Sequence, residues 1–515
     1  GTLAENGAGK MNDFDKDVLR RIHDLGVTHL WYTGVIRHAT CTDYSSFGIP
    51  TQNPRVVKGR AGSPYAITDY YDIDPDIAVD VDARMAEFES LVARTHTEGM
   101  KVIIDFVPNH VARQYKSIAK PKGVEDLGEG DDTGKHFDPQ NNFYYCPGEQ
   151  LDLSGVVENT YAHDAEAYHE CPAKCTGNDR FDSHPQQNDW YETIKLNYGV
   201  DYCDAGGRSY HYHPLPSTWK KMTDILLFWA AKGVDGFRCD MAEMVPHEFW
   251  AYATLQVKER YPEMIFIGEV YDPNQYRMYV ESGFDYLYDK VGMYDCVRGV
   301  MCDERPASSI TYEWQKVDDI RDHMLYFLEN HDEQRIASDF FAGNPWKGVP
   351  GMIVSALLQQ NPVMVYAGQE FGERGMDKEG FSGQDGRSTI FDYWTSDAIY
   401  KGFFNRDALT TDEKKLSLVY QGLLRFCNRE KAVREGLTFD LMYVNHQSHQ
   451  FNPHKQFAFL RKADDEVLLV VANFNQERVQ INVTIPAHAF DFLGIPEQEV
   501  EMTDLLSGFT KVVDL

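Results

Sequence analysis

The stretch Gly233-Val234-Asp235-Gly236-Phe237-Arg238-Cys239-Asp240 decides the fold of this chain. Apolar side chains recur before it at steps of three and four residues, which predicts an amphipathic helix; these are Trp219, Met222, Ile225, Leu226 and Trp229. Ser217 is the predicted N-cap, and Gly233 ends the helix because the C′ position favours glycine. A short strand then carries Arg238 and Asp240 to its carboxyl end.

Arg238 and Asp240 lie two residues apart, so a strand places both side chains on one face. A guanidinium beside a carboxylate favours the ionised carboxylate, which is the form that a carboxylate nucleophile requires. The pair is also consistent with an ion pair that closes a strand end and has no catalytic role. This stretch alone does not decide between the two interpretations, so the rest of the chain has to be considered.

The chain alternates predicted strands and helices over most of its length. Helices are predicted from residues 15–25 and 85–92, and nearly unbroken apolar strands at 27–32, 101–107, 236–240, 264–270, 284–288, 324–328 and 363–366. Buried apolar strands between helices indicate a parallel sheet, and repetition on this scale favours a (β/α)₈ TIM barrel over an open doubly wound sheet. No first barrel strand is evident, because residues 1–13 are polar and rich in glycine.

Two segments interrupt the alternation and define the predicted domains. Residues 111–199 are rich in Asp, Gly, Asn, Pro and Tyr without a helical period, which predicts an inserted domain between barrel segments 1–110 and 200–434. Residues 435–515 are predicted to form an all-β domain, an antiparallel β-sandwich. A hairpin turn is expected at 463–466, and apolar and polar residues alternate from Val479 to Ile485.

Composition limits the partners of the protein. The chain has 515 residues with 80 acidic and 50 basic side chains, a net charge of −30, which argues against nucleic acid or an anionic membrane surface as partner. No run of 18 apolar residues exists, so no membrane span is expected. No signal peptide is visible and the first residue is Gly1; we expect a periplasmic or extracellular location rather than the cytoplasm. The nine cysteines favour scattered free thiols over a Cys171–Cys175 disulfide or a metal cluster.

Four carboxylates close separate predicted strands, and one arginine and two histidines accompany them. The carboxylates are Asp105, Asp240, Glu269 and Asp332, and the other residues are Arg238, His110 and His331. The carboxyl ends of barrel strands form one rim, where active sites lie. Glycoside cleavage needs one acid kept protonated and one kept ionised. Any one of these side chains alone is consistent with a solvated strand end, but the set predicts a glycosidase site.

These stretches resemble the α-amylase family of glycoside hydrolases, family 13, over nearly the whole chain. The resemblance rests on Asp105-Phe106-Val107-Pro108-Asn109-His110, Gly236-Phe237-Arg238-Cys239-Asp240, Gly268-Glu269-Val270 and Phe327-Leu328-Glu329-Asn330-His331-Asp332, in the order of the family. Ser63-Pro64-Tyr65-Ala66-Ile67 and Gly368-Gln369-Glu370-Phe371-Gly372 support it. Asn141 to Tyr145 and Lys195 to Gly199 resemble signatures of a bacterial starch-degrading type.

The resemblance implies a role for each rim residue. Asp240 would be the nucleophile, Glu269 the general acid/base and Asp332 the carboxylate that binds sugar hydroxyls; Asp105, His110, Arg238 and His331 would contact substrate or nucleophile, and Tyr65 would stack on a sugar ring. It also implies that 111–199 is the family's B domain and 435–515 its C domain. The expected activity is a retaining α-glucan hydrolase acting on α-1,4 bonds of starch or malto-oligosaccharides. A 4-α-glucanotransferase and a non-catalytic sugar-binding barrel are the alternatives.

Calcium is the one cofactor that the resemblance raises. Lys195 stands where the family often has an aspartate that binds a structural calcium, and an ammonium cannot ligate a cation, so Lys195 is expected to replace the charge of the ion. The acidic loop with Asp126, Asp131 and Asp132 is a second candidate calcium site, and a solvated acidic turn is its alternative. Glu243 and Met244 replace a frequent Lys-His pair beyond the nucleophile.

Overall fold

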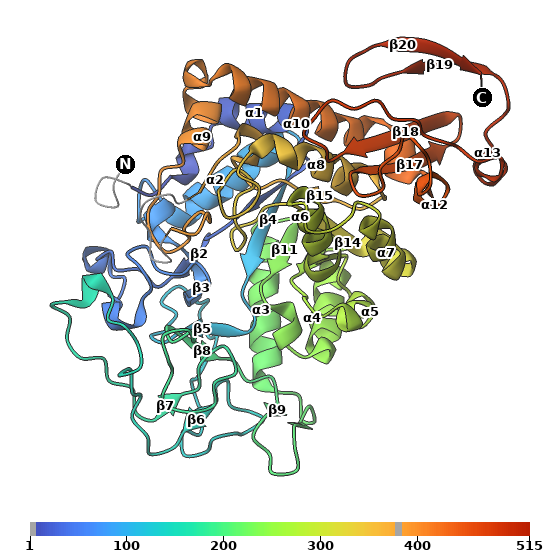
Figure 1. Cartoon of the computed structure of the whole chain (residues 1–515). Helices are drawn as coiled ribbons and strands as arrows, with labels where there is room; N and C mark the ends of the chain where they lie inside the picture. Colours follow the sequence, from blue (N-terminus) through green and yellow to red (C-terminus); the bar gives the residue numbers. More distant parts are fainter. Residues whose placement is uncertain (1–6, 376–383, 515) are drawn as a thin grey trace.

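A parallel sheet organises the protein, whose computed structural model describes residues 7–375 and 384–514. The sheet has seven strands in the order β1-β4-β11-β12-β13-β14-β15, and it curls with helices outside it (Figure 1). The strands are β1 (His29–Tyr32), β4 (Lys101–Phe106), β11 (Gly236–Cys239), β12 (Ile265–Gly268), β13 (Tyr286–Tyr288), β14 (Met324–Phe327) and β15 (Val363–Met364). Every strand predicted for the barrel is present. Residues 7–15 contain only the 3₁₀ turn Met11–Asp13, and residues 1–6 lie outside the described part.

The helices follow the predicted alternation. The main ones are α1 (Lys16–Leu25), α2 (Arg84–Thr97), α3 (Ser217–Ala231), α4 (His247–Arg260), α5 (Tyr276–Glu281), α6 (Asp295–Met301), α7 (Ser309–Lys316), α8 (Gly348–Leu357) and α10 (Thr411–Arg429). Gly233 ends α3 at φ 92°, as predicted. The prediction that Ser217 caps α3 is wrong. Pro216 is the N-cap, and the Ser217 hydroxyl instead accepts a hydrogen bond from the Asn142 amide (2.9 Å).

The register of the central strands places the site residues side by side. Arg238 on β11 is opposite Asp105 on β4, and Cys239 is opposite Gly268 on β12. Asp240 and Glu269 are the next residues on their strands, so they leave the sheet at matched positions on one edge. Interstrand hydrogen bonds extend to both residues, from Asp240 N to Phe106 O (2.9 Å) and from Glu269 N to Cys239 O (3.1 Å).

The segment between β4 and α3 is built from short antiparallel pairs. These are β5 (His110–Ala112) with β8 (Thr193–Lys195), β6 (Tyr145–Cys146) with β7 (Ala173–Lys174), and β9 (Val200–Asp201) with β10 (Ser209–Tyr210). Figure 1 shows this segment below the sheet, on the side toward which β4 and β11 lead. All nine cysteines are free thiols; the Cys175 sulfur lies 3.8 Å from that of Cys146, and Cys171 is exposed.

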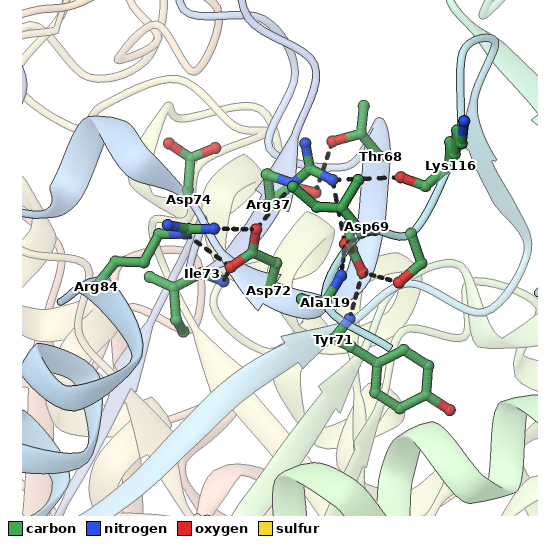
Figure 2. A network of polar contacts seen from close by, with 12 residues as sticks. Arg37, Thr68, Asp69, Tyr71, Asp72, Ile73, Asp74, Arg84, Lys116 and Ala119 are labelled. Atoms are coloured by element: carbon green, nitrogen blue, oxygen red, sulfur yellow. Dashed lines mark hydrogen bonds and ion pairs between the residues drawn. The ribbon is translucent and has the colours of Figure 1, made fainter. Parts of the chain in front are cut away.

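A buried ionic network holds the hairpin of β2 (Ile36–His38) and β3 (Ile67–Ile73) (Figure 2), and Tyr65 lies in the connection between these two strands. Arg37 lies 3.1 Å from Asp69 and 3.2 Å from Asp72. Asp72 also accepts two hydrogen bonds from Arg84 on α2, at 2.7 and 2.9 Å. The carboxylate oxygens of Asp69 also accept hydrogen bonds from the Ser117 hydroxyl and from the backbone amides of Tyr71, Ile118 and Ala119. The network therefore ties the hairpin to α2 and to the segment after β5.

The C-terminal region differs from its prediction. It holds a three-stranded antiparallel sheet of β16 (Leu437–Asp440), β17 (Gln456–Ala463) and β18 (Glu466–Asn473), and a separate hairpin of β19 (Glu499–Thr503) and β20 (Thr510–Asp514). The predicted turn at 463–466 is confirmed. The predicted strand at 479–485 is wrong, because the Asn445 side chain binds both backbone groups of Thr484, at 2.8 and 2.9 Å. Helices α12 (Met442–Asn445) and α13 (Ala487–Leu493) also interrupt the predicted all-β region, and most hairpin residues are exposed, so the described residues show no closed sandwich.

Candidate active site

The candidate site lies at the carboxyl ends of β4, β11, β12 and β14. Asp105 is the second-last residue of β4. Asp240 and Glu269 directly follow β11 and β12, and His331 and Asp332 follow β14. The structure thus brings together most of the predicted rim residues. Backbone register alone explains this, since parallel strands end at the same edge of a barrel.

Arg238 is the centre of the site, and its side chain is fully buried. Its Nη1 lies 3.2 Å from Asp105 Oδ1 and 3.1 Å from Asp240 Oδ1, and its Nη2 lies 2.8 Å from Glu269 Oε2. The sequence predicted the pairing with Asp240 but not with the other two. Nη1 donates hydrogen bonds to Asp105 and Asp240, and Nη2 makes an ionic contact with Glu269. One guanidinium therefore lies between three carboxylates.

The electrostatics of the carboxylates correct one prediction. Burial, followed by the Glu269 carboxylate, raises the pKa of Asp240, and Arg238 only opposes this shift. The expectation that Arg238 holds the pKa of Asp240 low is wrong, because three carboxylates compete for one guanidinium away from water. Burial also raises the pKa of Asp105 to about 6. Asp105 and Asp240 therefore retain their protons more readily than exposed carboxylates do.

Tyr65 and His331 form one wall of the site. Their rings stack with centroids 5.2 Å apart, and the Tyr65 hydroxyl lies 2.8 Å from His331 Nε2. Burial lowers the pKa of His331 to about 3, so this imidazole is neutral at pH 7. Tyr65 is 8% exposed, and one ring face is covered by His331. A sugar ring would therefore have to stack on the opposite face.

Asp332 and His110 differ in their exposure to solvent. The Asp332 side chain is 43% exposed, and its Oδ2 lies 3.2 Å from His331 Nε2. Asp332 is thus placed to meet an incoming ligand, whereas Asp240 and Glu269 are buried. His110 is buried beside Asn109, and burial followed by the Lys195 charge lowers the pKa of His110 to about 3. His110 joins the wall next to Tyr65 rather than the group around Arg238.

Three oxygen atoms surround the Lys195 ammonium. Its buried ammonium donates to the Asn109 amide oxygen and to the Met244 carbonyl (3.3 Å), and lies 2.7 Å from the Asp179 carboxylate. An amide, a carbonyl and a carboxylate are the oxygen ligands that calcium takes. A divalent ion does not fit between them while the ammonium is there, because the two positive charges would repel each other.

The second predicted calcium site is not supported by the contacts. Asp126 accepts from the Ser117 amide (2.9 Å), and Asp131 accepts from the amides of Asn142 and Phe143 and from the Tyr145 hydroxyl. Asp132 lies 3.3 Å from the Lys135 ammonium. The three carboxylates hold separate parts of the loop. Within residues 7–375 and 384–514, no group of three or more acidic, His or Cys side chains is arranged to bind a metal.

Three aromatic side chains complete the site, and the sequence patterns did not predict their roles. Trp31 Nε1 donates to Asp105 (2.9 Å), the Tyr288 hydroxyl accepts from Arg238 Nε (3.2 Å), and the Tyr271 hydroxyl donates to Glu269 Oε1. Trp31 and Tyr288 lie near the carboxyl ends of predicted strands, so the rim position was a signal that could have identified them. Tyr271 lies on a loop and no sequence pattern indicates it.

The comparison with family models is decisive: the model described as the alpha amylase catalytic domain matches residues 7–416. The chain belongs to the α-amylase family. "Alpha-amylase 3" of Dictyoglomus thermophilum is 22% identical over 469 residues, covering 86% of this chain and 81% of that protein. "Alpha-amylase MalA" of Haloarcula japonica is 24% identical and covers 96% of this chain but 55% of its own length.

Solved structures of α-amylase family proteins share the fold. The maltogenic α-amylase AmyB of Thermotoga neapolitana has a TM-score of 0.62 at 19% identity, with 99% of this chain and 92% of that chain covered. An α-amylase of Lactobacillus plantarum gives the same TM-score at 20% identity, covering 99% and 93%. The chain is thus an α-amylase-family enzyme of the glycoside hydrolase class with a (β/α)-barrel fold. In the residues described, no helix has both the length and the apolar composition to cross a membrane.

Proposed function

We propose that this α-amylase-family protein is a retaining α-glucan hydrolase that cleaves α-1,4 bonds of starch or malto-oligosaccharides. One observation carries the proposal: Asp240 and Glu269 leave adjacent strands at matched positions and share the Arg238 guanidinium. Adjacent strands are about 4.8 Å apart. That spacing agrees with the roughly 5–5.5 Å between the carboxyl groups of retaining enzymes rather than the 6.5–9.5 Å of inverting ones.

The proposed reaction has two steps. An oxygen of Asp240 attacks the anomeric carbon as the glycosidic C–O bond breaks, and Glu269 gives its proton to the departing oxygen. A water then loses its proton to Glu269 and attacks the same carbon, which breaks the bond to Asp240 and releases the sugar. Asp332, the exposed carboxylate of the three, binds hydroxyl groups of the sugar. Tyr65 stacks on the ring that is cleaved.

The region from 111 to 199 is proposed to serve as the B domain and to complete the substrate cleft. Lys195 is proposed to supply the positive charge at its junction with the barrel, because its ammonium joins Asn109 after β4 to Asp179 in this region. The protein then needs no calcium at this place.

Two alternatives have specific support. A transferase uses the same intermediate with a sugar as acceptor in place of water, and a relative in Cereibacter sphaeroides, 26% identical over 178 residues, is named a maltosyltransferase. A non-catalytic role is the second alternative, since rat "Amino acid transporter heavy chain SLC3A1" is 26% identical over 238 residues, although the chain spans only 28% of it. The presence of Asp240, Glu269 and Asp332 together favours an enzyme.

Product analysis over time distinguishes these possibilities. The protein would be incubated with maltoheptaose, pullulan and starch, and the products separated by chromatography. A hydrolase gives only shorter oligosaccharides from maltoheptaose, and their reducing ends increase with time. A transferase also gives products longer than maltoheptaose at constant reducing ends. An absence of products from all three substrates would contradict both enzymatic proposals.

A further inference from the structure

Both carboxyl oxygens of Glu269 are occupied by hydrogen-bond donors. Oε2 accepts from the Met241 amide (2.8 Å) and lies 2.8 Å from Arg238 Nη2, and Oε1 accepts from the Tyr271 hydroxyl. The Glu269 side chain is only 2% exposed, so water does not replace these partners. The Met241 amide and the Tyr271 hydroxyl are thus the two hydrogen-bond donors to this carboxyl group, and the Arg238 guanidinium is its ionic partner. A donor to a carboxyl group stabilises the carboxylate more than the acid, since a carboxylate only accepts whereas a protonated acid must also donate.

The proposed reaction requires Glu269 to be protonated in the first step and ionised in the second. A neighbour of Glu269 that can both donate and accept is compatible with both states, and the Tyr271 hydroxyl is such a group. Arg238 is held by Asp105, Asp240 and Tyr288 in addition to Glu269, and the Met241 donor is a backbone amide. Tyr271 is therefore the one side-chain hydrogen-bond donor to Glu269 among the described residues.

Glu243 fixes the backbone from which Tyr271 projects. Its Oε2 accepts from the amides of both Tyr271 and Asp272, at 3.0 Å each. Glu243 lies in the turn after β11, whereas Tyr271 lies in the loop after β12. The carboxylate thus joins the loop that follows the candidate nucleophile to the loop that follows the candidate acid/base. This gives a structural role to the residue that replaces a frequent lysine of the family.

We propose that Tyr271 is a positioning residue whose hydroxyl orients Glu269 and stabilises its ionised state, and that Glu243 holds Tyr271 in place for this purpose. The inference rests on the proposed function of Glu269 as general acid/base. While Tyr271 donates to Oε1, the carboxylate is oriented to take a proton from water.

The pH dependence of Tyr271→Phe tests this role. Phenylalanine keeps the ring and removes the hydroxyl donor, so the protonated form of Glu269 persists to higher pH. The basic limb of kcat/KM on maltoheptaose should move up by about one pH unit, the effect of one hydrogen bond to a charged group. Tyr443→Phe, which removes an exposed hydroxyl in the C-terminal region, is the matched control and should leave the limb in place. An unmoved basic limb in Tyr271→Phe would overturn the proposal.

An activated substrate separates the two steps. The dinitrophenolate of a dinitrophenyl α-maltoside is a leaving group that departs without acid assistance, so the first step on this substrate does not need the proton of Glu269. Tyr271→Phe should then keep kcat/KM and lower kcat, because only the second step uses Glu269 as base. Glu243→Ala should reproduce the Tyr271→Phe changes in reduced form, whereas Glu243→Gln, whose amide oxygen still accepts both backbone hydrogens, should remain close to the unsubstituted protein. Equal losses in Glu243→Gln and Glu243→Ala would contradict the role of Glu243.

A titration without substrate keeps this inference distinct from the proposed function. Carbon NMR of the protein labelled at glutamate carboxyl groups, with Glu269→Gln to assign the signal, follows the protonation of Glu269 directly. The midpoint should rise in Tyr271→Phe even if the protein cleaves none of the glucans tested. An unchanged midpoint in a variant of native stability would overturn the inference whatever the substrate proves to be.

Discussion

Nη2 of Arg238 lies 2.8 Å from Oε2 of Glu269, and both side chains are buried. The same guanidinium binds Asp240 through Nη1 at 3.1 Å. One cation therefore contacts both the candidate acid/base and the candidate nucleophile, and the charge of Glu269 raises the pKa of Asp240. The predictions below follow from this arrangement and from the buried charges around it.

Substitution of either carboxylate should abolish turnover without unfolding the protein. Glu269→Gln and Asp240→Asn each keep the shape of the side chain, and each should lower kcat by several orders of magnitude, on the order of 10⁴ or more, as happens when one member of a catalytic unit is lost. Activity on starch and thermal unfolding would be measured together. Asp319→Asn, in an exposed ion pair, should behave like the unsubstituted protein. Near-normal turnover in either variant would remove that residue from the mechanism.

Calcium dependence should appear only when Lys195 is replaced. A chelator should leave the activity and the melting temperature of the unsubstituted protein unchanged. Lys195→Asp exchanges the ammonium for a carboxylate beside Asn109 and Asp179, so this variant should melt at lower temperature and recover with millimolar calcium. Lys195→Met removes the charge without adding a ligand, and calcium should not restore it. Rapid inactivation of the unsubstituted protein by EDTA would contradict the proposal.

Stability should fall as the pH rises toward neutrality, and Glu370 should account for part of the loss. Burial raises the pKa of Glu370 from its ordinary value of 4.5 to about 7. The folded state therefore holds this proton more tightly than the unfolded chain, so the stabilisation is complete below about pH 4.5 and is lost as the pH passes 7.

Glu370→Gln should flatten this dependence, because an amide does not ionise. Relative to the unsubstituted protein, the variant should gain up to roughly 3 kcal/mol between pH 4.5 and pH 8, the free energy that corresponds to this difference in pKa. Urea unfolding at a series of pH values measures it. Parallel stability curves for the two proteins would show that Glu370 is not the titrating group.

The network in Figure 2 should make Arg37 far more important for stability than an exposed arginine. Arg37→Met leaves Asp69 and Asp72 buried without one of their cationic partners, and should cost about 3–5 kcal/mol. Arg277 pairs with Asp319 at 2.6 Å on the surface, where both side chains are about half exposed, and Arg277→Met should cost less than about 1 kcal/mol. Equal losses in the two variants by denaturant unfolding would contradict this account of the hairpin.

The sequence was sufficient to predict the barrel strands and most of the rim residues. Long apolar runs such as 101–107 have few alternatives to a buried strand, and the rule that sites lie at carboxyl ends then identifies Asp240 and Glu269. The alternation from Val479 to Ile485 predicted a strand that is not there. Asn445, more than thirty residues away, binds the backbone of Thr484 in place of a neighbouring strand. Local patterns do not contain such side-chain contacts.

The details of the site were beyond local patterns for the same reason. The contacts of Arg238 with Asp105 and Glu269 depend on strand register, and that of Tyr271 with Glu269 depends on a loop held by Glu243. The direction of the pKa shift of Asp240 depends on how many carboxylates share the guanidinium and on their burial, so the pair Arg238 and Asp240 considered alone gave the opposite expectation. Lys195 was identifiable because a single residue departs from the pattern of the family.

The anomeric configuration of the first product tests the central claim most directly. If Asp240 attacks the anomeric carbon and Glu269 activates the water from the same face, two inversions retain the configuration of the substrate. Proton NMR of the anomeric signals in the opening minutes of maltoheptaose cleavage, before mutarotation, separates the two outcomes. The account predicts that the α-anomer appears first. An initial β-anomer would contradict the assignment of Asp240 as nucleophile.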